Sequence, residues 1–207
     1  MALKKKFMDI SLPLTGDSFT ALGTIESLVG KTIKLDLTRK LRGKGLEITF
    51  LIVEKDGKLI GLPKSFILIK SYIRRIMRTG TSYVEDSFKA QSKDGEVTMK
   101  PFLLTRKKVS RAVRNHLRQV AREQLLEIAK DKTFSELTEE VYSGNLQKSL
   151  IPKLKKVYPL AFCDLRVFET NKPILDENIK IPEKKKEVEE YIEEDEEEKP
   201  KKQKKKE

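Results

Sequence analysis

The chain has 207 residues, which is enough for one or two domains with a hydrophobic core. Its formal net charge of +12 favours an anionic partner. The single cysteine, Cys163, excludes an internal disulfide and a multi-thiolate metal site, and no apolar run approaches the roughly 18–20 residues of a membrane span.

The charge is unevenly distributed along the chain. From Lys180 to the end, acidic and basic residues almost balance, so the positive excess lies in residues 1–179. The first residues, MALKKKFMDISLPL, lack the apolar stretch of about 7–15 residues that a secretion signal needs. We therefore expect a soluble intracellular protein with no membrane partner.

The first part of the chain predicts an arm followed by strands. Residues 1–30 show little periodicity and are interrupted by a proline and three glycines, so we expect an N-terminal arm. Residues 32–37 alternate apolar and polar side chains, as a half-buried strand does. Residues 46–53 become apolar throughout, as in a strand buried on both faces, and the loop between the two strands, TRKLRGKG, is basic.

Two Asp-Gly pairs flank an apolar stripe in the middle of the chain. Asp56-Gly57 and Asp94-Gly95 are typical of type I′ hairpin turns, which need positive φ at both central residues. Between them, residues 63–80 predict a helix that begins near a proline and ends before a glycine. The expected buried stripe of this helix is Phe66, Ile69, Ile73, Ile76 and Met77. The opposite side carries Lys70, Arg74, Arg75 and Arg78.

Residues 106–130 predict a long helix with two contrasting faces. At roughly 100° per residue, one side collects Val109, Val113, Leu117, Val120 and Ile128, with Ala121 and Leu125 at its margin. The other side collects Arg111, Arg114, Arg118 and Arg122, joined by Lys108. Five of the eleven arginines of the chain lie in residues 106–122, and that segment contains no acidic residue. So many like charges at helical spacing would repel each other without an anionic partner.

The remainder predicts two short helices, a last strand and a charged tail. Thr133 and Glu136 form a capping-box pattern for a helix that Gly144 ends, and a further helix and a strand follow over residues 145–157 and 160–168. From residue 181 onward the chain is almost all charge blocks, so we expect disorder there. These elements predict an α+β fold with an antiparallel, barrel-like sheet and flanking helices. We divide the chain into an arm (1–30), a binding body (31–180) and a tail (181–207).

A search for catalytic chemistry finds little. The stretch Val29-Gly30-Lys31-Thr32 lacks the glycine that a phosphate-binding loop needs five positions before its second glycine. Cys163 lies in an apolar strand and is expected to be a small core residue, and the single histidine, His116, is expected to pack or to contact a partner. We therefore predict no catalytic residue, no metal site and no cofactor.

The basic loop and helix faces remain as candidate binding sites. The planar guanidinium of arginine suits bidentate phosphate contact and stacking on bases, although phosphate contact does not separate DNA from RNA. For the helix over residues 63–80, a solvated basic face is the competing interpretation. The candidate nucleic-acid-binding residues are Lys31, Lys34, Arg39, Lys40, Arg42, Lys44, Arg74, Arg75, Arg78, Arg106, Lys107, Lys108, Arg111, Arg114, Arg118 and Arg122.

Three segments resemble a known family. The stretches GKTIKLDLTRKLRGKGLEITFLI, TRKKVSRAVRNHLRQVAREQLLEIA and IPKLKKVYPLAFCDLRVFETNK are similar, in the same order, to the small-subunit ribosomal protein family called S-three-Ae (eS-one). The similarity covers roughly residues 20–175 and is to the short archaeal form, while the mixed-charge tail departs from the family pattern.

This resemblance implies a structural constituent of the small ribosomal subunit, which acts in translation and is not an enzyme. It implies binding to small-subunit ribosomal RNA on the platform near the messenger-RNA exit. Neighbouring platform ribosomal proteins and mRNA near the exit would be further partners, in the cytoplasm. The alternative is a free RNA-binding translation or ribosome-assembly factor, which would share the basic faces but cycle on and off the ribosome.

Overall fold

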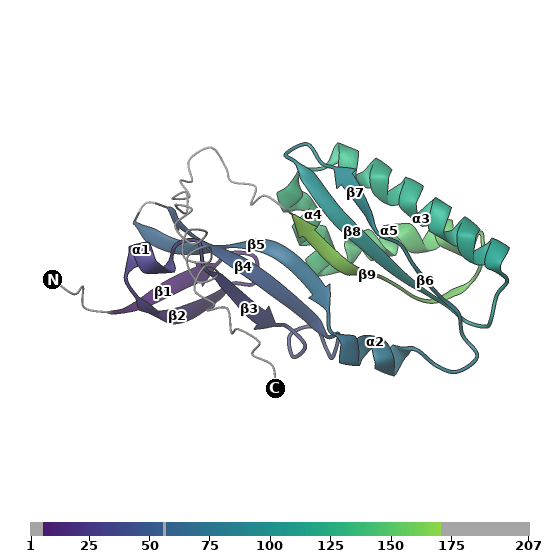
Figure 1. The fold of residues 1–207 in the computed structure, drawn as a ribbon, viewed down its shortest axis with the longest axis horizontal. Helices are drawn as coiled ribbons and strands as arrows, with labels where there is room; N and C mark the ends of the chain where they lie inside the picture. Colours follow the sequence, from purple (N-terminus) through teal and green to yellow (C-terminus); the bar gives the residue numbers. More distant parts are fainter. Residues whose placement is uncertain (1–5, 56, 171–207) are drawn as a thin grey trace, which may run out of the picture.

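The computed structural model describes residues 6–55 and 57–170, and the predicted tail therefore lies outside the described residues. Within the described part, nine strands form one mixed sheet and five helices pack beside it. Figure 1 shows an elongated molecule with the first five strands at one end and the remaining strands with three helices at the other. The fold is α+β, as predicted.

The first half of the sheet is built around one long strand. It contains β1 (Lys6–Leu12), β2 (Asp17–Gly23), β3 (Thr32–Asp36), β4 (Leu46–Lys55) and β5 (Lys58–Leu68). β4 pairs antiparallel with β3 and with β5, and the apolar run of β4 is buried on both faces as predicted. The other edge of β5 has two neighbours. The beginning of β5 pairs in parallel with β1, and the end of β5 pairs antiparallel with the last described strand, over residues 160–170.

The prediction of an irregular N-terminal arm is wrong for the described residues 6–23. β1 and β2 form an antiparallel hairpin, and a single helical turn, α1 (Ile25–Leu28), follows. Ile10 and Leu12 are buried in the core, whereas Asp9 and Ser11 beside them are exposed. This alternation of buried and exposed residues is short and is followed at once by a turn, so it was not recognised as a strand in the sequence.

The helix predicted over residues 63–80 is much shorter than expected. β5 continues through Leu68, and α2 covers only Lys70–Ile76. Phe66 and Leu68 are buried on one side of the strand, in a period of two, whereas the predicted helical stripe contained Phe66 but not Leu68. Pro63 is tolerated because the register between β4 and β5 shifts beside it, and bulges are among the few places that accept proline in a sheet.

The second half of the sheet is joined to the first by its last strand. It contains β6 (Tyr83–Glu85), β7 (Phe88–Gln91), β8 (Glu96–Thr105) and β9 (Leu160–Thr170). β9 lies between β5 and β8, and the far edge of β8 pairs with β7 and then with β6. The sheet is therefore branched and open, so the predicted barrel-like form is wrong, while the predicted antiparallel pairing holds for every strand pair except β1 with β5.

The first predicted hairpin is present. Lys55 pairs with Lys58 across residues 56 and 57, which joins β4 to β5. Gly57 has a φ of +72°, in the region that favours glycine. Residue 56 lies outside the described residues, so the type I′ assignment stays a prediction.

The second predicted hairpin joins β7 to β8, but its turn type was predicted wrongly. Gly95 is not among the residues with positive φ, which a type I′ turn would require. The amide of Ser92 donates to the carbonyl of Gly95 at 2.8 Å, and the carboxylate of Asp94 accepts from the amide of Phe134 at 3.0 Å. This turn therefore contacts the start of α4, and its type is not the one that the Asp-Gly pair predicted.

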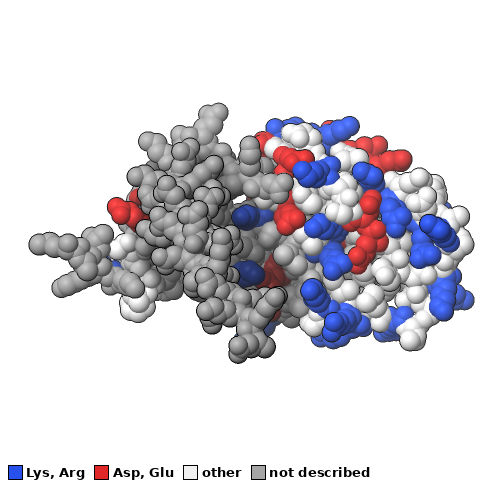
Figure 2. Space-filling model, viewed as in Figure 1, with Lys and Arg blue, Asp and Glu red and all other residues white. Residues whose placement is uncertain are grey.

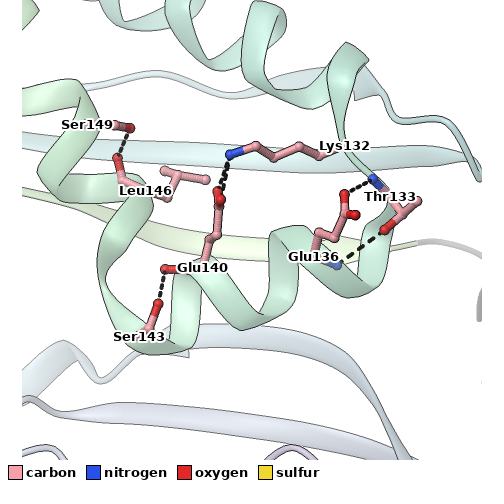
Figure 3. A network of polar contacts seen from close by, with 7 residues as sticks. All are labelled: Lys132, Thr133, Glu136, Glu140, Ser143, Leu146 and Ser149. Carbon is pink, nitrogen blue, oxygen red and sulfur yellow. Dashed lines mark hydrogen bonds and ion pairs between the residues drawn. The ribbon is translucent and has the colours of Figure 1, made fainter.

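Three helices, α3 (Arg111–Asp131), α4 (Phe134–Ser143) and α5 (Asn145–Lys155), gather beside strands β6–β9 (Figure 1). The predicted capping box of α4 is confirmed: the Thr133 hydroxyl accepts from the Glu136 amide, and the Glu136 carboxylate accepts from the Thr133 amide at 3.0 Å (Figure 3). The backbone hydrogen bond from Thr133 lowers the pKa of Glu136. Gly144, in the left-handed conformation, ends α4 as predicted.

Contacts between phenylalanine rings connect the two halves of the core. Phe66 of β5 meets Phe168 of β9 edge-on, with ring centroids 5.8 Å apart. Phe168 in turn stacks on Phe134 of α4 at 5.7 Å. One continuous apolar cluster therefore runs from the first hairpin to α5 and holds the basic elements in fixed positions.

Candidate nucleic-acid interface

The buried stripe of α3 sets which of its residues face outward. Leu117, Ala121, Leu125 and Ala129 are completely buried, because α3 packs against β6, β7 and α5 along this row. Ala121 and Leu125 thus form the centre of the stripe, not its margin as predicted, while Val113, Val120 and Ile128 are only partly buried. The helix begins later than predicted, with Ser110 as its N-cap, so residues 106–108 precede it.

The N-terminal end of α3 presents two unpaired arginines. Arg111 and Arg114 are exposed, and neither side chain forms a hydrogen bond or ion pair with the part of the chain that is described. Arg106, Lys107 and Lys108 are exposed in the preceding connection. Figure 2 shows lysine and arginine side chains gathered at this end of the molecule.

The other two arginines of the predicted basic side of this helix, Arg118 and Arg122, contact neighbouring residues. The Nε of Arg118 donates to the carbonyl oxygen of Glu85 at 3.1 Å, and one of its terminal nitrogens donates to Asn115 at 3.4 Å. The guanidinium of Arg122 lies over the ring of Phe88, 5.5 Å from its centroid. These contacts fix the two side chains in place without neutralising their charge.

The charge on α3 lies at the electrostatically unfavourable end of the helix. The first turn contains no acidic residue, although aligned peptide dipoles give a helix N-terminus a partial positive charge. Arginines there repel the dipole as well as each other. A bound anion would offset both terms, and the exposed amides of a helix N-terminus are themselves anion ligands.

The structure brings a second basic element to the same end of the molecule. Arg74 and Arg78 are exposed at or just beyond the end of α2, and Arg75 lies over the ring of Tyr72 at 5.8 Å. The amide of Ile69 donates to the carbonyl of Gly45 at 2.9 Å, so the basic loop between β3 and β4 adjoins the start of α2.

The basic residues of this loop and of β3 differ in what they contact. Lys31, Arg39 and Arg42 are exposed. Lys34 lies 3.7 Å from Glu47, and Lys40 pairs with Asp17, whose pKa it lowers by hydrogen bonding. Lys44 is mostly buried, and its ammonium lies 2.6 Å from the carboxylate of Asp164 on β9. Lys44 therefore has an internal partner, which the sequence did not reveal.

Two residues near these helices were missed by the sequence analysis. Tyr83 is one of the few exposed large hydrophobic residues in the described structure, at the start of edge strand β6. Arg166 of β9 forms an ion pair with Glu85 of β6 at 2.8 Å. The sequence placed Arg166 in a predicted strand and Tyr83 ahead of the second predicted hairpin, but neither pattern shows which strand lies at an edge beside a basic helix.

Other chemistry is not supported within the described residues. Burial raises the pKa of the Cys163 thiol to about 12, with the nearby carboxylate of Asp164 adding to the shift, so this cysteine is a core residue as predicted. No cluster of histidine, cysteine, aspartate or glutamate there could hold a metal ion. None of the described helices has the length and apolar character to span a membrane.

Comparison with known proteins gives consistent matches. A model described as the Ribosomal S3Ae family matches residues 4–173. The small ribosomal subunit protein eS1 of Methanothermobacter thermautotrophicus is 34% identical over 90 residues, which cover 43% of this chain and 46% of that relative. The small ribosomal subunit protein eS1 of Saccharolobus islandicus is 30% identical over 158 residues, or 75% of each chain. The eS1 protein of Saccharolobus solfataricus is 28% identical over 158 residues, again 75% of each chain.

Proposed function

Because the chain belongs to the ribosomal S3Ae family, we propose that it is a structural constituent of the small ribosomal subunit that binds small-subunit rRNA on the platform near the mRNA exit. The family resemblance inferred from the sequence is confirmed, and this family consists of ribosomal proteins, not enzymes. The protein acts in translation on cytoplasmic ribosomes. Neighbouring platform proteins and mRNA near the exit are the further partners that we propose.

The N-terminal end of α3 carries this proposal. Arg111 and Arg114 have no partner among the described residues, and they stand where the helix dipole favours an anion. The phosphates of ribosomal RNA would supply that anion, and planar guanidinium groups would bind them in bidentate fashion. The apolar stripe on the opposite side fixes the helix to the sheet, so the backbone that carries the two arginines is positioned before RNA binds.

The remaining candidates extend the interface from this centre. On or before α3 we assign Arg106, Lys107, Lys108, Arg118 and Arg122, on α2 and just beyond it Arg74, Arg75 and Arg78, and on β3 and near the basic loop Lys31, Lys34, Arg39, Lys40 and Arg42. Lys44 is not assigned to the interface, because its ammonium forms an ion pair with Asp164.

Removal of the two unpaired arginines tests the interface. The double variant Arg111→Gln, Arg114→Gln keeps helix propensity and should leave the far-ultraviolet circular dichroism spectrum unchanged. Its binding to a small-subunit rRNA fragment should weaken, and the slope of log affinity against log salt should become shallower by about 0.7–0.9 for each phosphate that is no longer neutralised. The matched control removes two exposed lysines at the end of α5, Lys155→Gln and Lys156→Gln, and should change the slope less. A wild-type slope in the arginine variant would refute the interface.

The remaining alternative is a free translation or assembly factor. The two functions are separated by sedimentation of small subunits through a high-salt sucrose cushion. A structural constituent stays with the subunit in stoichiometric amount, whereas a factor held mainly by exposed ion pairs dissociates. The names of the relatives favour the constituent.

A further inference from the structure

Tyr83 is an exposed aromatic residue on a rigid base. The residue is 56% exposed at the start of the edge strand β6. Its ring lies nearly parallel to that of the completely buried Phe102, at 21° with centroids 6.5 Å apart. The pairing of Tyr83 with Leu104 holds its backbone in the sheet. The ring is therefore presented to solvent with little freedom to lose when a ligand stacks on it.

Two hollows meet at this ring, and each has a basic wall. One, of about 540 Å³, is lined by Tyr83 with Arg111, Arg114 and Arg118 of α3. The other, of about 320 Å³, is lined by Tyr83 with Lys70 and Arg74 of α2. The aromatic ring thus stands between cations from two helices that are separate in the sequence.

The acidic groups around this ring are largely compensated. Glu85, which lines the second hollow, is paired with Arg166 at 2.8 Å. Arg118 donates to the backbone carbonyl of the same Glu85 and keeps its full charge. The surface around Tyr83 therefore attracts anions on both sides of an apolar, planar group.

We propose that Tyr83 is a stacking platform for one unpaired base of single-stranded RNA, with the flanking phosphates held by Arg111 and Arg114 on one side and by Lys70 and Arg74 on the other. This site deepens the rRNA-binding function proposed above and rests on it. A base can stack on an aromatic ring only if its own face is free, which excludes a base inside a continuous duplex. An acidic peptide would satisfy the cations but would leave the exposed ring without a partner.

The test uses the full chain and two substitutions of the ring. Tyr83→Phe keeps the aromatic face, whereas Tyr83→Leu keeps an apolar side chain against Phe102 but removes the face. The matched control is Phe19→Leu, which removes an exposed aromatic ring from β2, in the other half of the sheet. The probes are a short single-stranded oligoadenylate and an RNA duplex of the same length, each titrated over a range of salt concentrations.

We expect Tyr83→Leu to weaken binding of the single strand by about 5- to 150-fold, since stacking on one aromatic residue contributes about 1–3 kcal/mol per base. The salt slope should stay unchanged because the same phosphates remain neutralised. Duplex affinity should also stay unchanged, and Tyr83→Phe and Phe19→Leu should bind like the wild type. Wild-type affinity of Tyr83→Leu for the single strand, or an equal reduction for single strand and duplex, would overturn the proposal.

A second measurement does not depend on the leucine variant folding. The chain contains five tyrosines and no tryptophan, so tyrosine emission can be observed directly. Oligoadenylate should quench the wild type more than Tyr83→Phe, and polyglutamate should not reproduce that difference. Equal quenching of both proteins, or the same difference with polyglutamate, would overturn the site.

The outcome separates this proposal from the wider one. If Arg111→Gln, Arg114→Gln loses affinity for both probes while Tyr83→Leu does not, the stacking site is wrong and the RNA interface stands. If the arginine variant binds both probes like the wild type, the interface itself fails, and the stacking site fails with it.

Discussion

Replacement of Lys44 by methionine should destabilise the protein without changing how it binds RNA. The Lys44 ammonium lies 2.6 Å from Oδ2 of Asp164, whose side chain is only 6% exposed. The other carboxylate oxygen accepts from the Gln147 amide nitrogen at 2.7 Å and from the Leu165 amide at 2.8 Å. In Lys44→Met these two hydrogen bonds remain, but a nearly buried negative charge loses its counter-charge.

The magnitude follows from the burial of the two partners. Removal of one partner of a fully buried pair costs about 3–5 kcal/mol, and Lys44 is 22% exposed, so we expect about 2–4 kcal/mol. Asp164→Asn should cost less, about 1–2 kcal/mol, because an amide can still accept from Gln147 while the lysine can reach water. The double variant should lose less than the sum, with a coupling energy of about 1–3 kcal/mol.

Urea unfolding of the four proteins, followed by circular dichroism, measures these free energies. Salt-dependent binding to the rRNA fragment is measured in parallel on the folded variants. If Lys44→Met unfolds at the wild-type midpoint but has a shallower salt slope, Lys44 faces RNA instead of Asp164, and the reasoning is refuted.

Further measurements test other parts of the fold. Gly61→Ala should lower the free energy of unfolding by about 1–3 kcal/mol in urea, because a Cβ there meets Leu12 of β1; a neutral effect would contradict that packing. Thr133→Ala should cost about 1 kcal/mol through loss of the N-cap, and an unchanged thermal midpoint would contradict this. The lowered pKa of Glu136 contributes stability above its ordinary pKa of 4.5 that is lost as the pH falls through the lower folded value, so Glu136→Gln should flatten the acid limb of stability against pH. Cys163 should react with a thiol reagent near about pH 8 only as fast as the protein unfolds; rapid labelling of the folded protein would contradict its burial.

Local signals predicted the elements whose cause is local. The two ends of α4 were predicted correctly. The helix begins at the capping box of Thr133 and Glu136 and ends at Gly144, which is left-handed. The apolar run of β4 is buried as expected because a strand covered on both faces has no polar side to show. The spacing of the α3 arginines likewise predicted the basic face, since it depends only on helical geometry.

The predictions failed where contacts with residues distant in the sequence determine the local structure. Phe66 fits a helical stripe in isolation, and pairing of β5 with both β4 and β9 makes it a strand residue. The β1–β2 hairpin is held by β5 and was hidden by its own short strands. In the candidate interface, Lys44 looked like its basic neighbours until Asp164 of β9 was placed beside it. Tyr83 became a candidate binding residue only because the fold places α2 and α3 on either side of it.

The position of β9 also governs the order in which a nascent chain can fold. β9 is the last strand described, yet it lies between β5 and β8 and joins the two halves of the sheet. Until residues 160–170 have been synthesised, β5 and β8 each lack a neighbour that they have in the finished protein. Pairing between segments so distant in sequence is slow, and unpaired strand edges bind other chains. The newly made protein is therefore most prone to aggregate just before its synthesis reaches β9, and a factor that covers these edges during translation would protect it.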